Sequence, residues 1–113
     1  MKKVSLLFLF LINGLILSAQ LYVEGLLLDA TNTSAYLEAT PLRRNDGTYH
    51  FKIDYGQKPK SDIKPGECLT DSKARRFEFR SAVDGLNFLY ENGWEVTVVY
   101  NVEDIRRYLL KRR

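Results

Sequence analysis

Alternation of apolar and polar residues predicts the clearest strand of the chain, residues 48–55. Successive side chains of a strand point to opposite faces of a sheet, so the alternation indicates one face on the core and one in water. His50 falls on the solvent face, where a surface histidine is a simpler interpretation than a metal ligand or a catalytic base. The core face would carry Tyr49, Phe51, Ile53 and Tyr55, and the solvent face His50, Lys52 and Asp54.

Two shorter strands are expected ahead of this one. Residues 21–28 are largely apolar and predict a strand with a bulge or bend at Gly25. Residues 35–40 predict a second strand, which Pro41 would stop. The dipeptide Asp46-Gly47, just before residue 48, is a strong hairpin signal.

Two more strands and an ambiguous segment are predicted further along. Residues 76–80 alternate again, and residues 94–100 are β-branched and apolar enough for a central strand. The last residues fit either a helix that begins after Asn101 or a turn at 101–104 followed by a strand that pairs back on 95–100. The local pattern leaves both open.

Helical spacing replaces alternation after Ser81. The Ser81 side chain can accept a hydrogen bond from the N–H of Asp84, and Asp84 can reach back, which is a capping box with Asp in place of Glu. Gly93 suits the left-handed position after a helix, and Gly85 would cost the helix about 1 kcal/mol relative to Ala. The predicted apolar stripe is Val83, Leu86, Leu89 and Tyr90, with Ala82 and Phe88 beside it.

The elements together predict an α+β fold: an antiparallel sheet of five or six strands with one main helix packed on one face. Leu86 and Leu89 would fill the layer between helix and sheet, and Trp94 would plug their junction. The residues expected to build this structural motif are Ser81, Asp84, Leu86, Leu89, Gly93 and Trp94.

The first 19 residues have the three parts of a secretory signal peptide. Lys2 and Lys3 form a basic start, residues 4–17 are mostly apolar, and Ser18-Ala19 supply small residues before the cut. The uninterrupted apolar run is too short for a membrane span. We therefore expect cleavage before Gln20, a single α+β domain over residues 20–113, no stable membrane anchor, and a periplasmic or extracellular location.

Composition narrows the function classes. Without residues 1–19 the chain keeps 15 basic and 14 acidic residues, and a nearly neutral domain has no electrostatic reason to bind nucleic acid. Cys68 is the only cysteine and His50 the only histidine. An intramolecular disulfide is therefore impossible, zinc lacks a ligand set, and no nucleophile and base are placed together by the pattern. We expect no catalytic residue, no metal and no cofactor.

Four short motifs lie in the second half of the chain: IDYGQ at 53–57, GLNFL at 85–89, GWE at 93–95 and YLLKR at 108–112. They resemble a family of small secreted bacterial domains of unknown function, which carries IDFGQ, ALNxL, GWE and a closing YxLKR. Gly85 departs from that pattern, where the family has Ala. The resemblance implies that the closing basic-aromatic segment is an edge or near-edge strand, and it implies no activity.

Two functional hypotheses remain. The first is a non-catalytic module that binds a protein or peptide partner by strand addition at an exposed edge, although basic residues at an edge also protect against aggregation. The alternative is a glycan-binding or small degradative protein that stacks sugars on aromatic side chains. The first would use Arg106, Arg107, Tyr108, Lys111 and Arg112, and the second Tyr22, Tyr36, Tyr49, Tyr55 and Trp94. The oligomeric state is left open.

Overall fold

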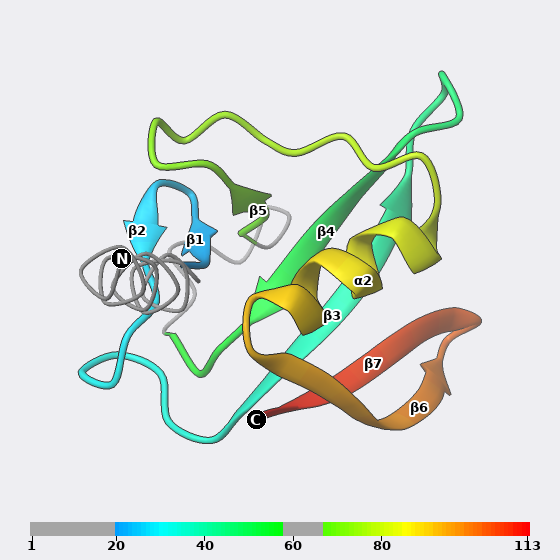
Figure 1. The fold of residues 1–113 in the computed structure, drawn as a ribbon. Coiled ribbons are helices and arrows are strands. Elements are labelled where there is room, and N and C mark those ends of the chain that lie inside the picture. Colours follow the sequence, from blue (N-terminus) through cyan, green and yellow to red (C-terminus); the bar gives the residue numbers. More distant parts are fainter. Residues whose placement is uncertain (1–19, 58–66) are drawn as a thin grey trace, which may run out of the picture.

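The computed structural model describes residues 20–57 and 67–113. Residues 1–19, which are the predicted signal peptide, and residues 58–66 lie outside this part of the chain. The described part contains seven strands and one helix (Figure 1): β1 Tyr22–Val23, β2 Leu26–Leu27, β3 Tyr36–Arg43, β4 Tyr49–Asp54, β5 Leu69–Thr70, α2 Ala82–Glu91, β6 Trp94–Val102 and β7 Ile105–Arg112. Within it, no helix is long and apolar enough to cross a membrane.

The strands form two antiparallel sheets rather than the single sheet of five or six strands that we predicted. One sheet has the order β2-β1-β5 and the other β4-β3-β7-β6. The prediction of one strand over 21–28 is wrong because Glu24 and Gly25 both adopt positive φ, 50° and 85°, and turn the chain into a two-residue hairpin. The coarser prediction, antiparallel strands with one helix, agrees with the structure.

Two other strand boundaries differ from the prediction. β3 continues through Pro41 to Arg43. Pairing of β3 with β7 ends at Ala39, so Pro41 has a neighbour on one side only, where a missing N–H is tolerated. Residues 76–80 make isolated bridges at Arg76 and Phe79 instead of a continuous strand.

The C-terminal alternative is decided in favour of the strand. β7 pairs with β6 from Val102–Ile105 to Trp94–Arg112, and a two-residue turn joins the strands. Glu103 and Asp104 both have positive φ, as such turns require. The prediction that residues 94–100 form a central strand is wrong, because β6 lies at the edge of the sheet and β7 lies next to it.

The helix begins and ends as predicted. Ser81 Oγ accepts from the N–H of Asp84 at 3.1 Å, and Gly93 follows the last turn with φ +95°. Asp84 reaches back to the N–H of Arg80, one residue earlier than in a standard capping box. The predicted stripe is too wide, because Val83 and Tyr90 are exposed, 62% and 50% respectively.

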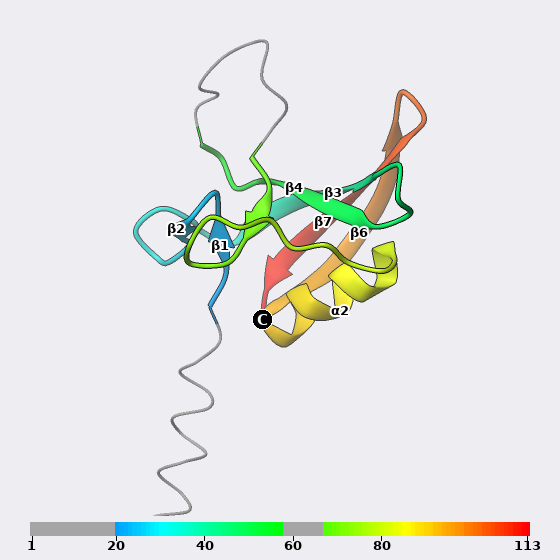
Figure 2. The same cartoon turned by 90° about the horizontal axis from the view of Figure 1, so that it is seen from above.

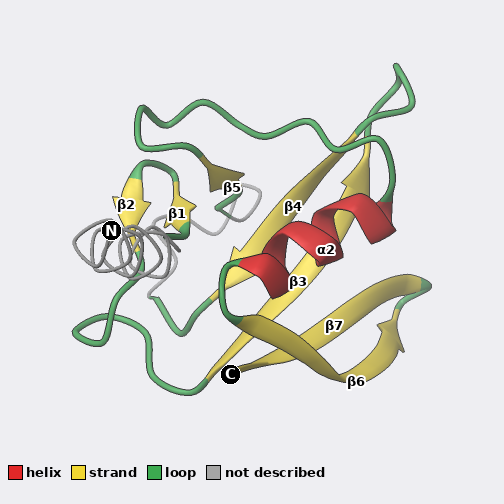
Figure 3. Cartoon of the chain, viewed as in Figure 1, coloured by secondary structure: helices red, strands yellow, loops and turns green. Residues whose placement is uncertain are grey.

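The core lies between α2 and one face of the four-stranded sheet (Figures 2 and 3), and it continues into the three-stranded sheet through Val23 and Leu69. Leu89 and Trp94 are buried there and Leu86 is partly buried, as predicted. Four aromatic rings continue this core on the β4 side: Phe51 stands edge-on to Phe79 at 5.5 Å, and Phe88 of α2 lies 4.8 Å from Phe77 and 5.6 Å from Phe79.

Gly85 is part of this packing, which corrects its interpretation as a mildly unfavourable helix residue. It is buried in the face of α2 that meets β4. A Cβ added at Gly85 would lie 2.2 Å from Cε1 of Phe51, whose ring is fully buried. The helix can approach the sheet this closely only because residue 85 has no side chain.

Candidate functional site: the open edge of the sheet

The two edges of the four-stranded sheet differ in what covers them. Outside β4 runs the segment 67–79, where Ile53 N–H donates to the Glu67 carbonyl at 2.7 Å and Tyr49 exchanges two backbone hydrogen bonds with Phe79. β6 pairs with β7 on one side, and no strand of residues 20–57 or 67–113 pairs with its other side. β6 forms the lower margin of the sheet in Figure 1.

The open edge is long and apolar. β6 has nine residues, and it carries one charge, Glu95. The exposed fractions are 48% at Val98 and 49% at Val99. Unpaired edges with this composition are templates for another strand, and proteins usually protect them with lysine, proline or a cover. The exposed apolar residues of β6 and the start of β7 are Val96, Val98, Val99, Val102 and Ile105.

A bulge decides where these valines point. Val96 is opposite Leu110 and Val98 is opposite Leu109, so Thr97 is the extra residue. Val99 is then opposite Tyr108, two residues from Leu110. Val96 and Val99 therefore share the face that α2 covers, whereas Val98 points to the opposite face.

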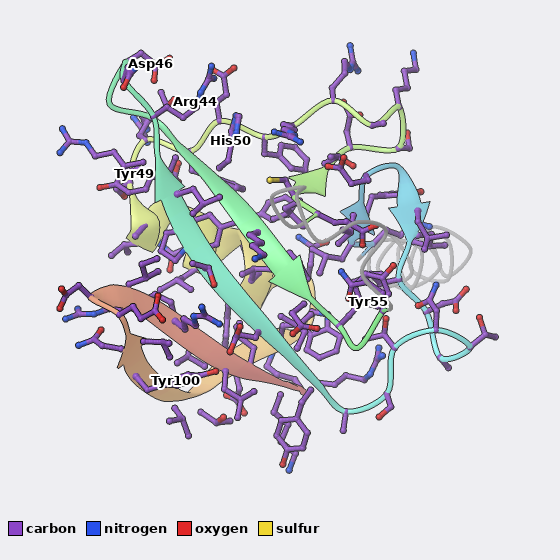
Figure 4. All side chains as sticks on the ribbon, turned by 180° about the vertical axis from the view of Figure 1, so that it is seen from behind. Arg44, Asp46, Tyr49, His50, Tyr55 and Tyr100 are labelled. Carbon is purple, nitrogen blue, oxygen red and sulfur yellow. The ribbon has the colours of Figure 1, made fainter. Side chains whose placement is uncertain are left out.

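The face of the sheet opposite α2 carries a polar cluster of Glu38, Tyr100 and Arg107. The Tyr100 hydroxyl donates to Glu38 Oε2, and Arg107 Nη1 lies 3.3 Å from Glu38 Oε1. The three residues come from β6, β3 and β7, so they tie neighbouring strands together away from α2. Figure 4 shows this side of the sheet, with Tyr100 and His50 labelled.

The predicted partner-binding residues divide between structural and free positions. Arg112 lies 4.7 Å above the Trp94 ring and donates to the carbonyls of Thr33 and Ser34. Arg107 binds Glu38, and Tyr108 packs against the core. Arg106 and Lys111 are exposed. The predicted residues lie on β7, which is next to the open edge, whereas the exposed valines lie on β6 at the edge itself.

The aromatic side chains proposed as sugar platforms differ in exposure. Trp94 is 3% exposed, which removes it as a stacking platform. Tyr36 is exposed, while Tyr22, Tyr49 and Tyr55 are half-buried.

The bridge between Lys52 and Cys68 places the only cysteine beside β4, the strand that carries His50. Cys68 is buried, and burial raises the pKa of its thiol, which disfavours the thiolate. His50 lies on the solvent face of β4 as predicted. Partial burial is the main cause that lowers the pKa of its imidazole, and the positive charges of Arg44 and Arg76 lower this pKa further. In the described part of the chain, no three His, Cys, Asp or Glu side chains are grouped to hold a metal ion.

The lowered pKa of His50 predicts a pH dependence of stability. Folding disfavours imidazole protonation, so the unfolded chain binds more protons between the folded pKa and 6.5. The free energy of unfolding should be constant just above pH 6.5 and fall as the pH drops toward the folded pKa. Urea unfolding at pH 7.5 and 5.5 should show this fall in the wild type and a smaller one in His50→Gln. Equal falls in both proteins would contradict it.

Comparison with known proteins gives no matching family model, no matching curated protein and no matching solved structure. The resemblance to small secreted domains therefore stays a prediction from four short motifs.

Proposed function

We propose that this protein is an exported, non-catalytic module that binds an extended segment of another protein or a peptide by adding it as a strand to β6. The observation that carries this proposal is the contrast between the two sheet edges. The β4 edge is covered by the segment 67–79, whereas the apolar β6 edge is open. Main-chain hydrogen bonds provide affinity in strand addition, and alternate side chains provide specificity.

Backbone geometry supports the proposal. A two-residue turn makes Val102 and Ile105 a hydrogen-bonded pair, and such pairs alternate along an antiparallel ladder. Tyr100 and Val98 then also bond to β7. The N–H and C=O groups of Val99 and Asn101 point away from β7, toward the position of an added strand.

The non-catalytic part is supported by the environment of the only thiol. Burial raises the pKa of Cys68, which disfavours its nucleophilic form. The nearly neutral charge without the predicted signal peptide gives no support to nucleic acid as the partner.

Peptide selection tests the proposal. A random nine-residue peptide library is selected on the purified chain, and the enriched peptides are measured on Val99→Pro. Proline at Val99 removes an outward N–H while leaving the ladder to β7 intact. The selected peptides should bind the variant about three- to tenfold more weakly, because one or more hydrogen bonds are lost.

The control is Val98→Thr, which keeps every backbone group. Circular dichroism establishes that each variant is folded. If Val99→Pro does not fold, the same peptides with N-methylated backbones should lose binding to the wild type instead. Equal binding of methylated and unmethylated peptides, or selection of no peptide at all, would exclude strand addition at β6.

A further inference from the structure

The exposed flank of α2 lies on the β6 side of the molecule. Phe88 contacts Phe77 and Phe79, so its flank of the helix faces the segment next to β4. At about 100° per residue, Val83 and Tyr90 lie about 150° around the helix from Phe88. Arg113 confirms this orientation, because its guanidinium lies 4.2 Å from the Tyr90 ring while its N–H donates to the carbonyl of Gly93, just before β6.

Four exposed apolar side chains therefore share the α2 side of the open edge: Val83 and Tyr90 from the helix, and Val96 and Val99 from β6. We name these four the apolar strip. The bulge at Thr97 is what brings both valines to it, since a regular strand would send residues three apart to opposite faces. An added strand would direct every second side chain onto this strip.

The end of the open edge at the turn between β6 and β7 carries negative charge. Glu103 and Asp104 form the turn at the far end of β6, both are exposed, and neither has an ion-pair partner within the described residues. Arg106, opposite Asn101, is the cation next to this turn. The turn therefore keeps an excess of negative charge, and it would lie beside the N-terminal end of a strand added antiparallel to β6.

We propose that the segment bound at β6 has two apolar side chains separated by one residue, which contact the apolar strip, and basic residues two and three positions N-terminal to the first of them, which meet Glu103 and Asp104. This inference rests on the proposed strand addition. A second copy of this chain fits less well, because antiparallel pairing of two β6 strands brings Glu95 of one copy toward the acidic turn of the other.

The probe is the peptide Arg-Lys-Thr-Leu-Thr-Leu-Thr-Ser, with binding measured by fluorescence anisotropy. One comparison peptide replaces Arg-Lys with Glu-Glu, and another places the two leucines side by side. Both should bind at least about threefold more weakly, from lost charge attraction in the first and lost apolar contact in the second. The penalty for Glu-Glu should shrink at high salt.

Two valines give a matched pair of protein variants. Val99 and Val98 are equally exposed neighbours on the same strand, but only Val99 lies on the apolar strip. Val99→Thr should weaken the probe at least about threefold, while Val98→Thr should leave it unchanged. The double variant Glu103→Gln, Asp104→Asn should bring the affinities of the Arg-Lys and Glu-Glu peptides together.

The outcomes separate this inference from the proposed function. Strand addition stands if the probe binds and Val99→Pro weakens its binding. In that case the stated segment chemistry is still overturned by either of two results: equal effects of Val98→Thr and Val99→Thr, or a Glu-Glu peptide that binds as tightly as the probe. If sedimentation shows a dimer that Val99→Pro dissociates, a second copy occupies the edge and the inference is wrong. If neither peptide binding nor dimerisation depends on Val99, the proposed function fails too.

Discussion

Gly85→Ala is expected to destabilise the protein by about 1–3 kcal/mol, the range for forcing an extra methyl group into a packed core. Helix propensity alone predicts the opposite, a gain of about 1 kcal/mol. Packing should win because the new Cβ would lie 2.2 Å from the Phe51 ring. That ring is fully buried and stands against Phe79, so it has little room to move. Urea unfolding of the variant and the wild type measures the difference.

Asn87→Ala is the matched control, because Asn87 is exposed on the same helix. This change should be neutral or slightly stabilising. Gly85→Ala should also cost less in a Phe51→Leu background, where the ring is gone, so the two changes should not be additive. A stabilising Gly85→Ala, or additive costs, would show that helix and sheet are not in the contact described.

Trp94→Ala should cost about 3–5 kcal/mol, as truncation of a buried large aromatic residue does. Trp94 is 3% exposed, begins β6 directly after the helix exit at Gly93, and lies beneath the Arg112 guanidinium. Its removal would leave a cavity at the junction of α2 and the sheet and would remove the cation–π contact of Arg112. Urea unfolding again provides the measurement.

Trp94→Phe distinguishes the loss of side-chain volume from the loss of the indole ring itself. This variant should retain most of the stability because an aromatic ring still fills part of the cavity. Val102→Ala, at the exposed far end of the same strand, should cost much less than Trp94→Ala. A cost below about 1 kcal/mol for Trp94→Ala would contradict the placement of this ring in the core.

Local signals in the sequence were sufficient where the structure is determined locally. The Ser81 cap and the Gly93 exit bound the helix as predicted. Alternation assigned the two faces of β4, since Phe51 and Ile53 are fully buried. These features depend on residues a few positions apart, and capping and alternation describe such neighbours directly.

Features that depend on distant neighbours were missed. The β-branched composition of residues 94–100 indicates a strand, but it does not say whether another strand lies on both sides. The need for glycine at position 85 comes from packing against Phe51, which is 34 positions away in the sequence. Val83 has helical spacing with the core residues, yet it faces β6, where the described chain offers nothing to cover it.

The candidate site was predicted in part for the same reason. The sequence predicts strand addition near the C-terminus through basic residues. Two of these, Arg107 and Arg112, are held by Glu38 and Trp94. Residues 94–100 were predicted to form a central strand. A nine-residue strand with four valines and one charge is compatible with a buried strand and with an open apolar edge, and the order of strands in the sheet distinguishes the two.

Hydrogen exchange of the β6 amides, with and without a peptide selected on the purified chain, tests the central claim most directly. Strand addition predicts that the outward N–H groups of Val99 and Asn101 exchange fast in the free protein and become protected on binding, while those of Val98 and Tyr100 are protected in both states. Unchanged exchange at Val99 and Asn101 in the saturated complex, or new protection confined to another part of the molecule, would contradict it.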